Sequence, residues 1–109
     1  MRKLRPRIRA FKLAQKVRTR LSAELGKPVK VILFGSQARG DATKESDIDL
    51  FVILPSMEAN VLNLAYEVAW EIGFEAGKVI SVIPDTEEAM SRFGFLPFYR
   101  NLEEEGIAV

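Results

Sequence analysis

The chain has 109 residues, a net charge of +1 and an apolar fraction of 48%, which suits one folded domain, residues 1–109, with a packed core. It contains neither histidine nor cysteine, which excludes disulfides, thiolate or imidazole metal sites and catalytic triads that use histidine. No apolar run reaches the roughly 18 residues that a membrane helix needs.

The N-terminal segment predicts an amphipathic helix over residues 7–25. Pro6 is tolerated in a first turn, and Gly26 followed by Pro28 ends the helix. The segment lacks the apolar core and cleavage site of a signal peptide, and we therefore expect a cytoplasmic protein. The apolar positions recur at steps of three and four residues; they are Leu4, Ile8, Phe11, Ala14, Val17, Leu21 and Leu25.

Charge is distributed unevenly along the chain. Residues 1–30 carry eleven basic side chains and one acidic one, whereas residues 31–109 carry five basic and fourteen acidic ones. Such an asymmetry can mark a nucleic-acid surface or simply a solvated helix face. No aromatic residues are interleaved for base stacking, and this favours the solvated face.

Two apolar strands flank a polar loop in the middle of the chain. We predict strands over 29–34 and 47–54 and a loop over 35–46, with one helical turn near residues 37–39. A helix, a third strand and two shorter helices are predicted to follow. Their expected bounds are 57–73 with Ser56 as N-cap, 78–83 ended by Pro84, a short helix whose capping box begins at Asp85, and 97–105 stopped by Gly106.

This order of elements predicts an α/β (α+β) sandwich, a small mixed β-sheet flanked by helices. Trp70 and Phe74 are expected to pack in its core. A C-terminal aromatic cluster could close the core or form a surface for a second copy or another partner; its members are Phe93, Phe95, Phe98 and Tyr99.

The polar loop and the strand after it carry the candidate chemistry. Asp47 and Asp49 stand at i and i+2 of a strand, so both carboxylates project from one face and repel each other unless a cation such as Mg²⁺ lies between them. Gly35 and Ser36 follow a strand, where backbone N–H groups and a hydroxyl can bind phosphate, and Arg39 could reach the same phosphates. Together these residues indicate metal-assisted phosphoryl or nucleotidyl transfer.

These residues form the pattern GSxxxG followed by SDxDL, which comprises Gly35, Ser36, Gly40, Ser46, Asp47, Asp49 and Leu50. The pattern resembles the signature of the DNA polymerase β-like nucleotidyltransferase superfamily, and the chain's small size resembles its minimal nucleotidyltransferase (MNT) branch. The resemblance implies the nucleotidyltransferase fold. Gly35 and Ser36 would bind the β- and γ-phosphates of a nucleoside triphosphate such as ATP. Asp47 and Asp49 would hold two Mg²⁺ ions for in-line attack by an acceptor hydroxyl, with pyrophosphate leaving.

The chain departs from the family pattern in one respect. The superfamily usually has a third carboxylate on a later strand, and the aligned position here is Ser81. Asp85 is the nearest acid in sequence, but a helix cap is its favoured role. An alternative hypothesis is therefore a module that binds a nucleotide or a partner and is catalytically weakened, unless another chain supplies the third acid.

The same resemblance implies a partner. MNT proteins are often found with a small helical protein of the HEPN class, and in some pairs the MNT subunit is an antitoxin that transfers AMP to a tyrosine of that partner. The acceptor is therefore expected to be a hydroxyl of a protein or an RNA.

Overall fold

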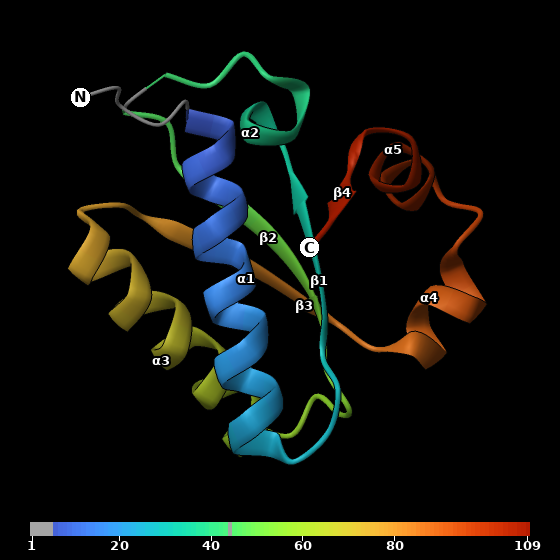
Figure 1. Cartoon of the computed structure of the whole chain (residues 1–109). Helices are drawn as coiled ribbons and strands as arrows, with labels where there is room; N and C mark the ends of the chain where they lie inside the picture. Colours follow the sequence, from blue (N-terminus) through green and yellow to red (C-terminus); the bar gives the residue numbers. More distant parts are fainter. Residues whose placement is uncertain (1–5, 44) are drawn as a thin grey trace.

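The computed structural model describes residues 6–43 and 45–109 (Figure 1). Leu4, the first position of the predicted helix stripe, lies outside the described residues. The elements follow the order predicted from the sequence, with one additional short strand at the C-terminus. Their bounds are α1 Pro6–Leu25, β1 Lys30–Phe34, α2 Ser36–Arg39, β2 Ile48–Ile53, α3 Ala59–Ala76, β3 Ile80–Asp85, α4 Glu87–Phe93, α5 Pro97–Glu105 and β4 Ile107–Ala108.

The four strands form one mixed sheet in the order β3-β2-β1-β4. Strand β1 pairs antiparallel with β2 and with β4, whereas β2 and β3 run parallel. A parallel pair needs a crossover connection, and α3 provides it. The register places Asp49 opposite Phe34 on one side and opposite Ser81 on the other. The predicted mixed sheet flanked by helices is therefore confirmed.

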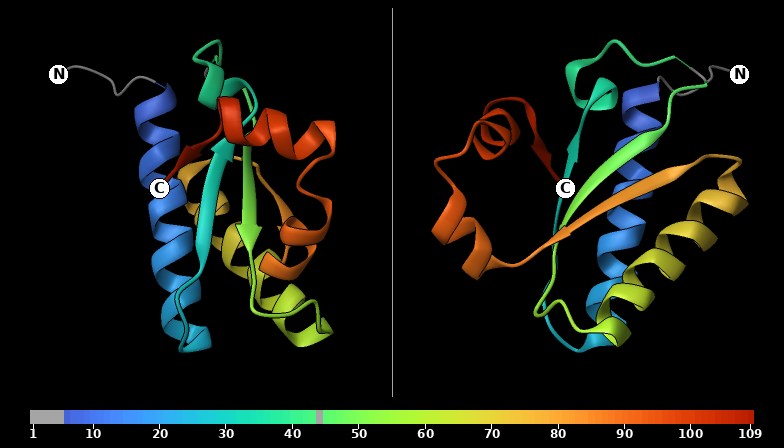
Figure 2. Two further views of the ribbon diagram at one scale, coloured as in Figure 1. Left: turned by 90° about the vertical axis from the view of Figure 1, so that its right-hand side faces the viewer. Right: turned by 180° about the vertical axis from the view of Figure 1, so that it is seen from behind.

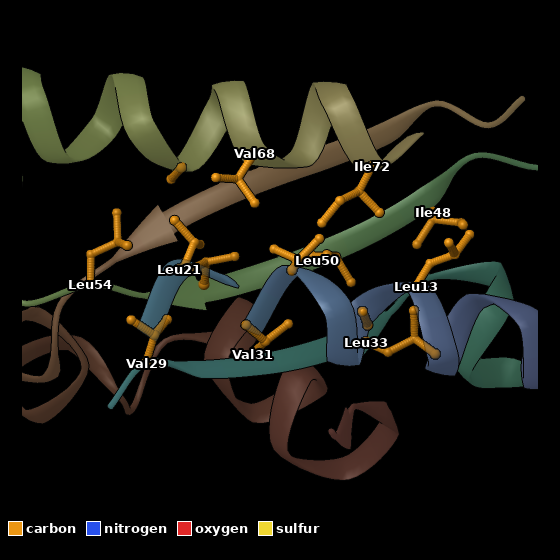
Figure 3. Close-up of a cluster of buried hydrophobic side chains, with 14 of the residues drawn as sticks. Leu13, Leu21, Val29, Val31, Leu33, Ile48, Leu50, Leu54, Val68 and Ile72 are labelled. Atoms are coloured by element: carbon orange, nitrogen blue, oxygen red, sulfur yellow. The ribbon is translucent and has the colours of Figure 1, made fainter. Parts of the chain in front are cut away.

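Helices α1 and α3 cover one face of the sheet and bury the main core against it (Figures 2 and 3). Alternate strand residues point to this face because side chains change sides at each step along a strand. Leu33 and Leu50 are fully buried between the sheet and the two helices. We call this side the closed face. Ile8 of the predicted stripe does not take part, since 46% of its surface is exposed.

The opposite face of the sheet is covered only in part, by α4 and α5, which lie on the far side from α1 and α3 (Figure 2). Phe51, Ile53 and Leu102 form a second, smaller core there. Phe98 and Tyr99 of α5 pack on it, with ring centroids 5.9 and 6.2 Å from that of Phe51. Of the C-terminal aromatic cluster, Tyr99 thus helps to close a core, whereas Phe93, Phe95 and Phe98 are each at least 42% exposed. We call this side the open face.

The prediction that Trp70 and Phe74 pack in the core is wrong. Both rings lie on the outer side of α3, 65% and 71% exposed, and stack on each other with centroids 5.1 Å apart. The residues of α3 that face the sheet are smaller aliphatic ones such as Val68 and Ile72. A helix packed between a sheet and a neighbouring helix has room for only one apolar stripe, and the aromatic pair falls outside it.

Two boundary predictions also need correction. Strand β3 does not stop at Pro84 but continues to Asp85, because proline is tolerated on an edge strand. Helix α3 begins at Ala59 rather than after Ser56, and the Ser56 hydroxyl only accepts a bond from the Glu58 N–H. None of the helices in the described part of the chain is long and apolar enough to span a membrane.

Candidate active site

Gly35 and Asp49 make the closest approach in the candidate site. Gly35 directly follows β1 and precedes α2. Its φ of 73° and ψ of −152° define a backbone conformation essentially restricted to glycine. A Cβ atom placed on it would lie 2.5 Å from Oδ2 of Asp49. The carboxylate of Asp49 therefore lies directly over the backbone where β1 turns into α2. The structure brings these two predicted site residues together, and it explains why residue 35 must be glycine.

The predicted helical turn is present as α2, a single turn that places Ser36 beside Gly35. The turn closes with bonds from the N–H of Arg39 to Gly35 O and from the N–H of Gly40 to Ser36 O, both 3.0 Å. The Arg39 side chain is exposed, and its Nε lies 3.4 Å from Oδ2 of Asp41. It is free to swing toward an anion at this end of the sheet, because an exposed ion pair is worth little.

Two residues that sequence reasoning missed hold this turn in place. Arg7 of α1 donates from Nε to Gln37 O at 3.2 Å and from Nη2 to Ala38 O. Gln37 is 1% exposed, and its Nε2 donates to the backbone oxygen of Asp47 at 3.4 Å. Gln37 thereby links the turn to the first acidic residue. Neither role leaves a signal in sequence periodicity, because both depend on distant backbone carbonyls.

The electrostatics of Asp49 suit a cation site. Burial raises the pKa of Asp49, and the neighbouring negative charge of Asp47 raises this pKa further, whereas Arg39 lowers it. Asp47 itself is exposed, one residue before the start of β2. A carboxylate such as Asp49, whose charged form is disfavoured by burial and by a neighbouring negative charge, would gain from a positive ion beside it.

The position aligned with the family's third acid lies beside Asp49 and carries serine. Ser81 of β3 pairs in register with Asp49. Asp85 lies four residues farther along β3, roughly 13 Å away at 3.3 Å per residue. It is buried and accepts bonds from the Tyr99 hydroxyl at 2.6 Å and the Thr86 N–H at 2.8 Å. Asp85 is therefore not the third acid.

Asp85 is also not the helix cap that its spacing predicted. Thr86 takes that role in α4, where its hydroxyl accepts a bond from the Ala89 N–H at 3.2 Å. Within residues 6–43 and 45–109, no group of three or more acidic side chains is placed to bind a metal ion. Any metal at this site would therefore rely on the pair Asp47 and Asp49, together with phosphate oxygens and water.

Comparison with known proteins assigns the chain to a family. The family model described as a nucleotidyltransferase domain matches residues 14–109. A Methanocaldococcus jannaschii protein, provisionally named a protein adenylyltransferase, is 38% identical over 81 residues, which are 74% of this chain and 77% of that protein.

A crystal structure from Sulfolobus solfataricus, described provisionally as a nucleotidyltransferase, shares the fold with a TM-score of 0.63. It is 20% identical in sequence, and the alignment covers 94% of this chain and 81% of that one. At this level of identity the likeness supports the fold alone.

Proposed function

Since the chain belongs to the nucleotidyltransferase domain family and is an enzyme that transfers nucleotides, we propose that it transfers AMP from Mg²⁺-bound ATP to a hydroxyl of a protein. The observation that carries this proposal is the contact of Asp49 with the Gly35 turn. It joins a carboxylate suited to Mg²⁺ with a backbone suited to phosphate. The archaeal relative's name, which specifies adenylyl transfer to protein, supports both the nucleotide and the acceptor.

The residues present fit a hard divalent cation. Mg²⁺ prefers carboxylate oxygen and substrate phosphate, and Asp47 and Asp49 offer such oxygens beside the phosphate-binding turn. When bound, the metal would supply charge stabilisation on the phosphoryl oxygens. In this proposal the backbone at Gly35 and the Ser36 hydroxyl orient the β- and γ-phosphates. Arg39 donates to the same phosphates from the solvent side.

The acceptor is proposed from the family resemblance. It would be a hydroxyl on a small helical partner of the HEPN class, with this chain as the antitoxin-type subunit. Such an acceptor could enter from the open face, where the surface beside Ser81 is exposed. A residue of the partner could also supply the acid that Ser81 does not provide.

The first test is titration of Mg²⁺-ATP into the purified chain by calorimetry, with the Asp47→Asn/Asp49→Asn double variant as control. We expect binding that requires Mg²⁺ and is lost in the double variant. Matching affinities with and without the two carboxylates would refute the proposed metal site. The Arg92→Ala variant is a second control, because Arg92 lies on α4 and pairs with Glu88 at 3.5 Å on an exposed surface.

Transfer is tested next, with ATP labelled at the α-phosphate and candidate partners encoded beside this chain. We expect label on the partner and release of pyrophosphate. The alternative, a weakened module, is favoured specifically by serine at position 81. It predicts nucleotide binding without label transfer, and introduction of the missing acid as Ser81→Asp should then restore turnover.

A further inference from the structure

An aromatic stripe on α3 lies beside an open edge of the sheet. Tyr66, Trp70 and Phe74 recur every fourth residue, so they form one line along the helix, and all three are exposed. Together with Lys78, Val79 and Ile80 they line a groove of about 440 Å³ between α3 and β3. Exposed apolar surface of this kind marks a site of association.

Strand β3 is the edge strand, and its outward hydrogen-bonding groups can be identified. The N–H of Ile48 donates to Val79 O and that of Leu54 donates to Asp85 O, so odd-numbered residues of β3 face β2. The alternation of a strand therefore turns the backbone groups of Ile80, Val82 and Pro84 outward. No strand pairs with this edge in the described part of the chain. Pro84 has no N–H to donate.

These groups allow one symmetric pairing with a second copy. A two-fold axis at Ser81 pairs Ile80 with the partner's Val82 and Val82 with the partner's Ile80, so all four N–H groups find acceptors. A two-fold axis at Val82 or Ile83 would require Pro84 to donate a backbone N–H, which proline lacks. An axis at Ile80 would require the N–H of Lys78, which already donates to Gly73 O at 2.8 Å.

The aromatic stripe has the same centre as this pairing. A Cβ on Gly73 would lie 3.2 Å from Cγ1 of Ile80, so these two residues lie side by side. One residue along a strand advances about 3.3 Å, which is about the rise of two helical residues at 1.5 Å each. Since α3 runs antiparallel to β3 and Gly73 lies beside Ile80, Ser81 lies level with residue 71 of α3. The stripe is centred one residue away, at Trp70. An axis there brings Trp70 to the partner's Trp70 and Tyr66 to the partner's Phe74.

We propose that the chain forms a two-fold symmetric dimer in which the β3 edges pair antiparallel about Ser81 and the aromatic stripes of α3 cover each other. The two sheets then form one eight-stranded sheet. The occupant is a second copy because the hydrogen-bonding groups of the edge and the apolar groups of the helix are both self-complementary about one axis. This inference stands apart from the transfer chemistry and does not depend on it.

The absence of cysteine from the chain makes a direct test possible. In the proposed pairing the two Ser81 residues form a non-hydrogen-bonded antiparallel pair with Cα atoms about 4.5 Å apart, within the range of a disulfide. Ser81→Cys should therefore cross-link to a dimer on mild oxidation. Ser91→Cys, exposed on α4, is the matched control and should remain monomeric on a non-reducing gel.

Sedimentation tests the same surface without a covalent bond. We expect a mass of twice the 12.3 kDa chain, a shift to monomer in Trp70→Asp, and no shift in Phe95→Asp, where an equally exposed ring lies away from the interface. Trp70→Asp should also reduce the cross-linking of Ser81→Cys at least tenfold. A monomer at every concentration, or a dimer in which Ser81→Cys cross-links no faster than Ser91→Cys, would overturn the proposal.

Discussion

The same strands carry fully buried residues on the closed face of the sheet and partly exposed residues on the open face. On the closed face, Leu33 and Leu50 are fully buried beneath α1 and α3. On the open face, the neighbouring residues Phe34 and Asp49 are only partly buried, and Phe98 of α5 packs on the Phe34 ring at 6.3 Å between centroids. Asp49 and Leu50 are adjacent in sequence, yet Asp49 belongs to the candidate site and Leu50 to the main core. The contrast shows how a small domain can place chemistry next to its stabilising core.

The largest expected effect tests the closed face. Leu50→Ala removes a side chain with no exposed surface, and we expect the free energy of unfolding to fall by about 2–5 kcal/mol. The Mg²⁺-ATP affinity of the molecules that remain folded should stay within a few-fold of the wild type. Chemical denaturation and calorimetry measure the two quantities separately. If Leu50→Ala lost nucleotide affinity without losing stability, the closed face could not be regarded as purely structural.

The adjacent residue on the open face should show the opposite pattern. Asp49→Asn should weaken Mg²⁺-ATP binding by more than about 100-fold, since changing even an outer-shell partner of a metal typically costs 10–100-fold. The variant should remain folded, because Asp49 lies outside both apolar cores. Unchanged affinity would place the nucleotide elsewhere on the molecule. Circular dichroism and calorimetry on the same sample make the comparison with Leu50→Ala direct.

A smaller effect is expected where α1 reaches the site. Arg7→Ala removes the bonds to the carbonyls of Gln37 and Ala38 and should lower the free energy of unfolding by about 1.5 kcal/mol. Because those carbonyls belong to α2, the turn proposed to bind phosphate, nucleotide affinity should also fall. Arg9→Ala is a matched control, since Arg9 donates to Ala76 O at the end of α3. Equal losses of affinity in both variants would count against a positioning role.

The smallest expected effect is a dependence of stability on pH. Burial and the charge of Asp47 raise the pKa of Asp49, so in the acidic range the folded state binds this proton more tightly than the unfolded state does. The ionised group therefore lowers stability above its folded pKa, and this cost disappears as the pH falls below the ordinary value of about 3.9. Without metal, Asp49→Asn should be more stable than the wild type at pH 7, and the difference should shrink on acidification. Thermal unfolding of both proteins at several pH values measures it.

The residues of the candidate site could be chosen from local sequence alone. The GS turn and the two aspartates lie within fifteen residues. Strand alternation predicted that Asp47 and Asp49 share a face, although β2 begins only at Ile48, one residue after Asp47. The mixed sheet was predicted from the order of apolar runs. The replacement of the third acid by Ser81 was predicted from alignment with the family pattern. Such features depend on neighbours in the chain, and a sequence displays those neighbours directly.

Other features were decided only by the tertiary structure. Whether Trp70 and Phe74 are buried depends on which apolar stripe of α3 packs against the sheet and α1. Two such stripes lie side by side on α3, and sequence periodicity does not show which of them is buried. The role of Arg7, the separation of Asp85 from the site and the open edge of β3 all arise from pairings between distant segments. By itself, the sequence determined the residues of the candidate chemistry: a Gly-Ser turn after one strand and two carboxylates at the start of the next. Only the tertiary structure decided what surrounds that chemistry, because residues far apart in the chain meet through strand register and helix packing.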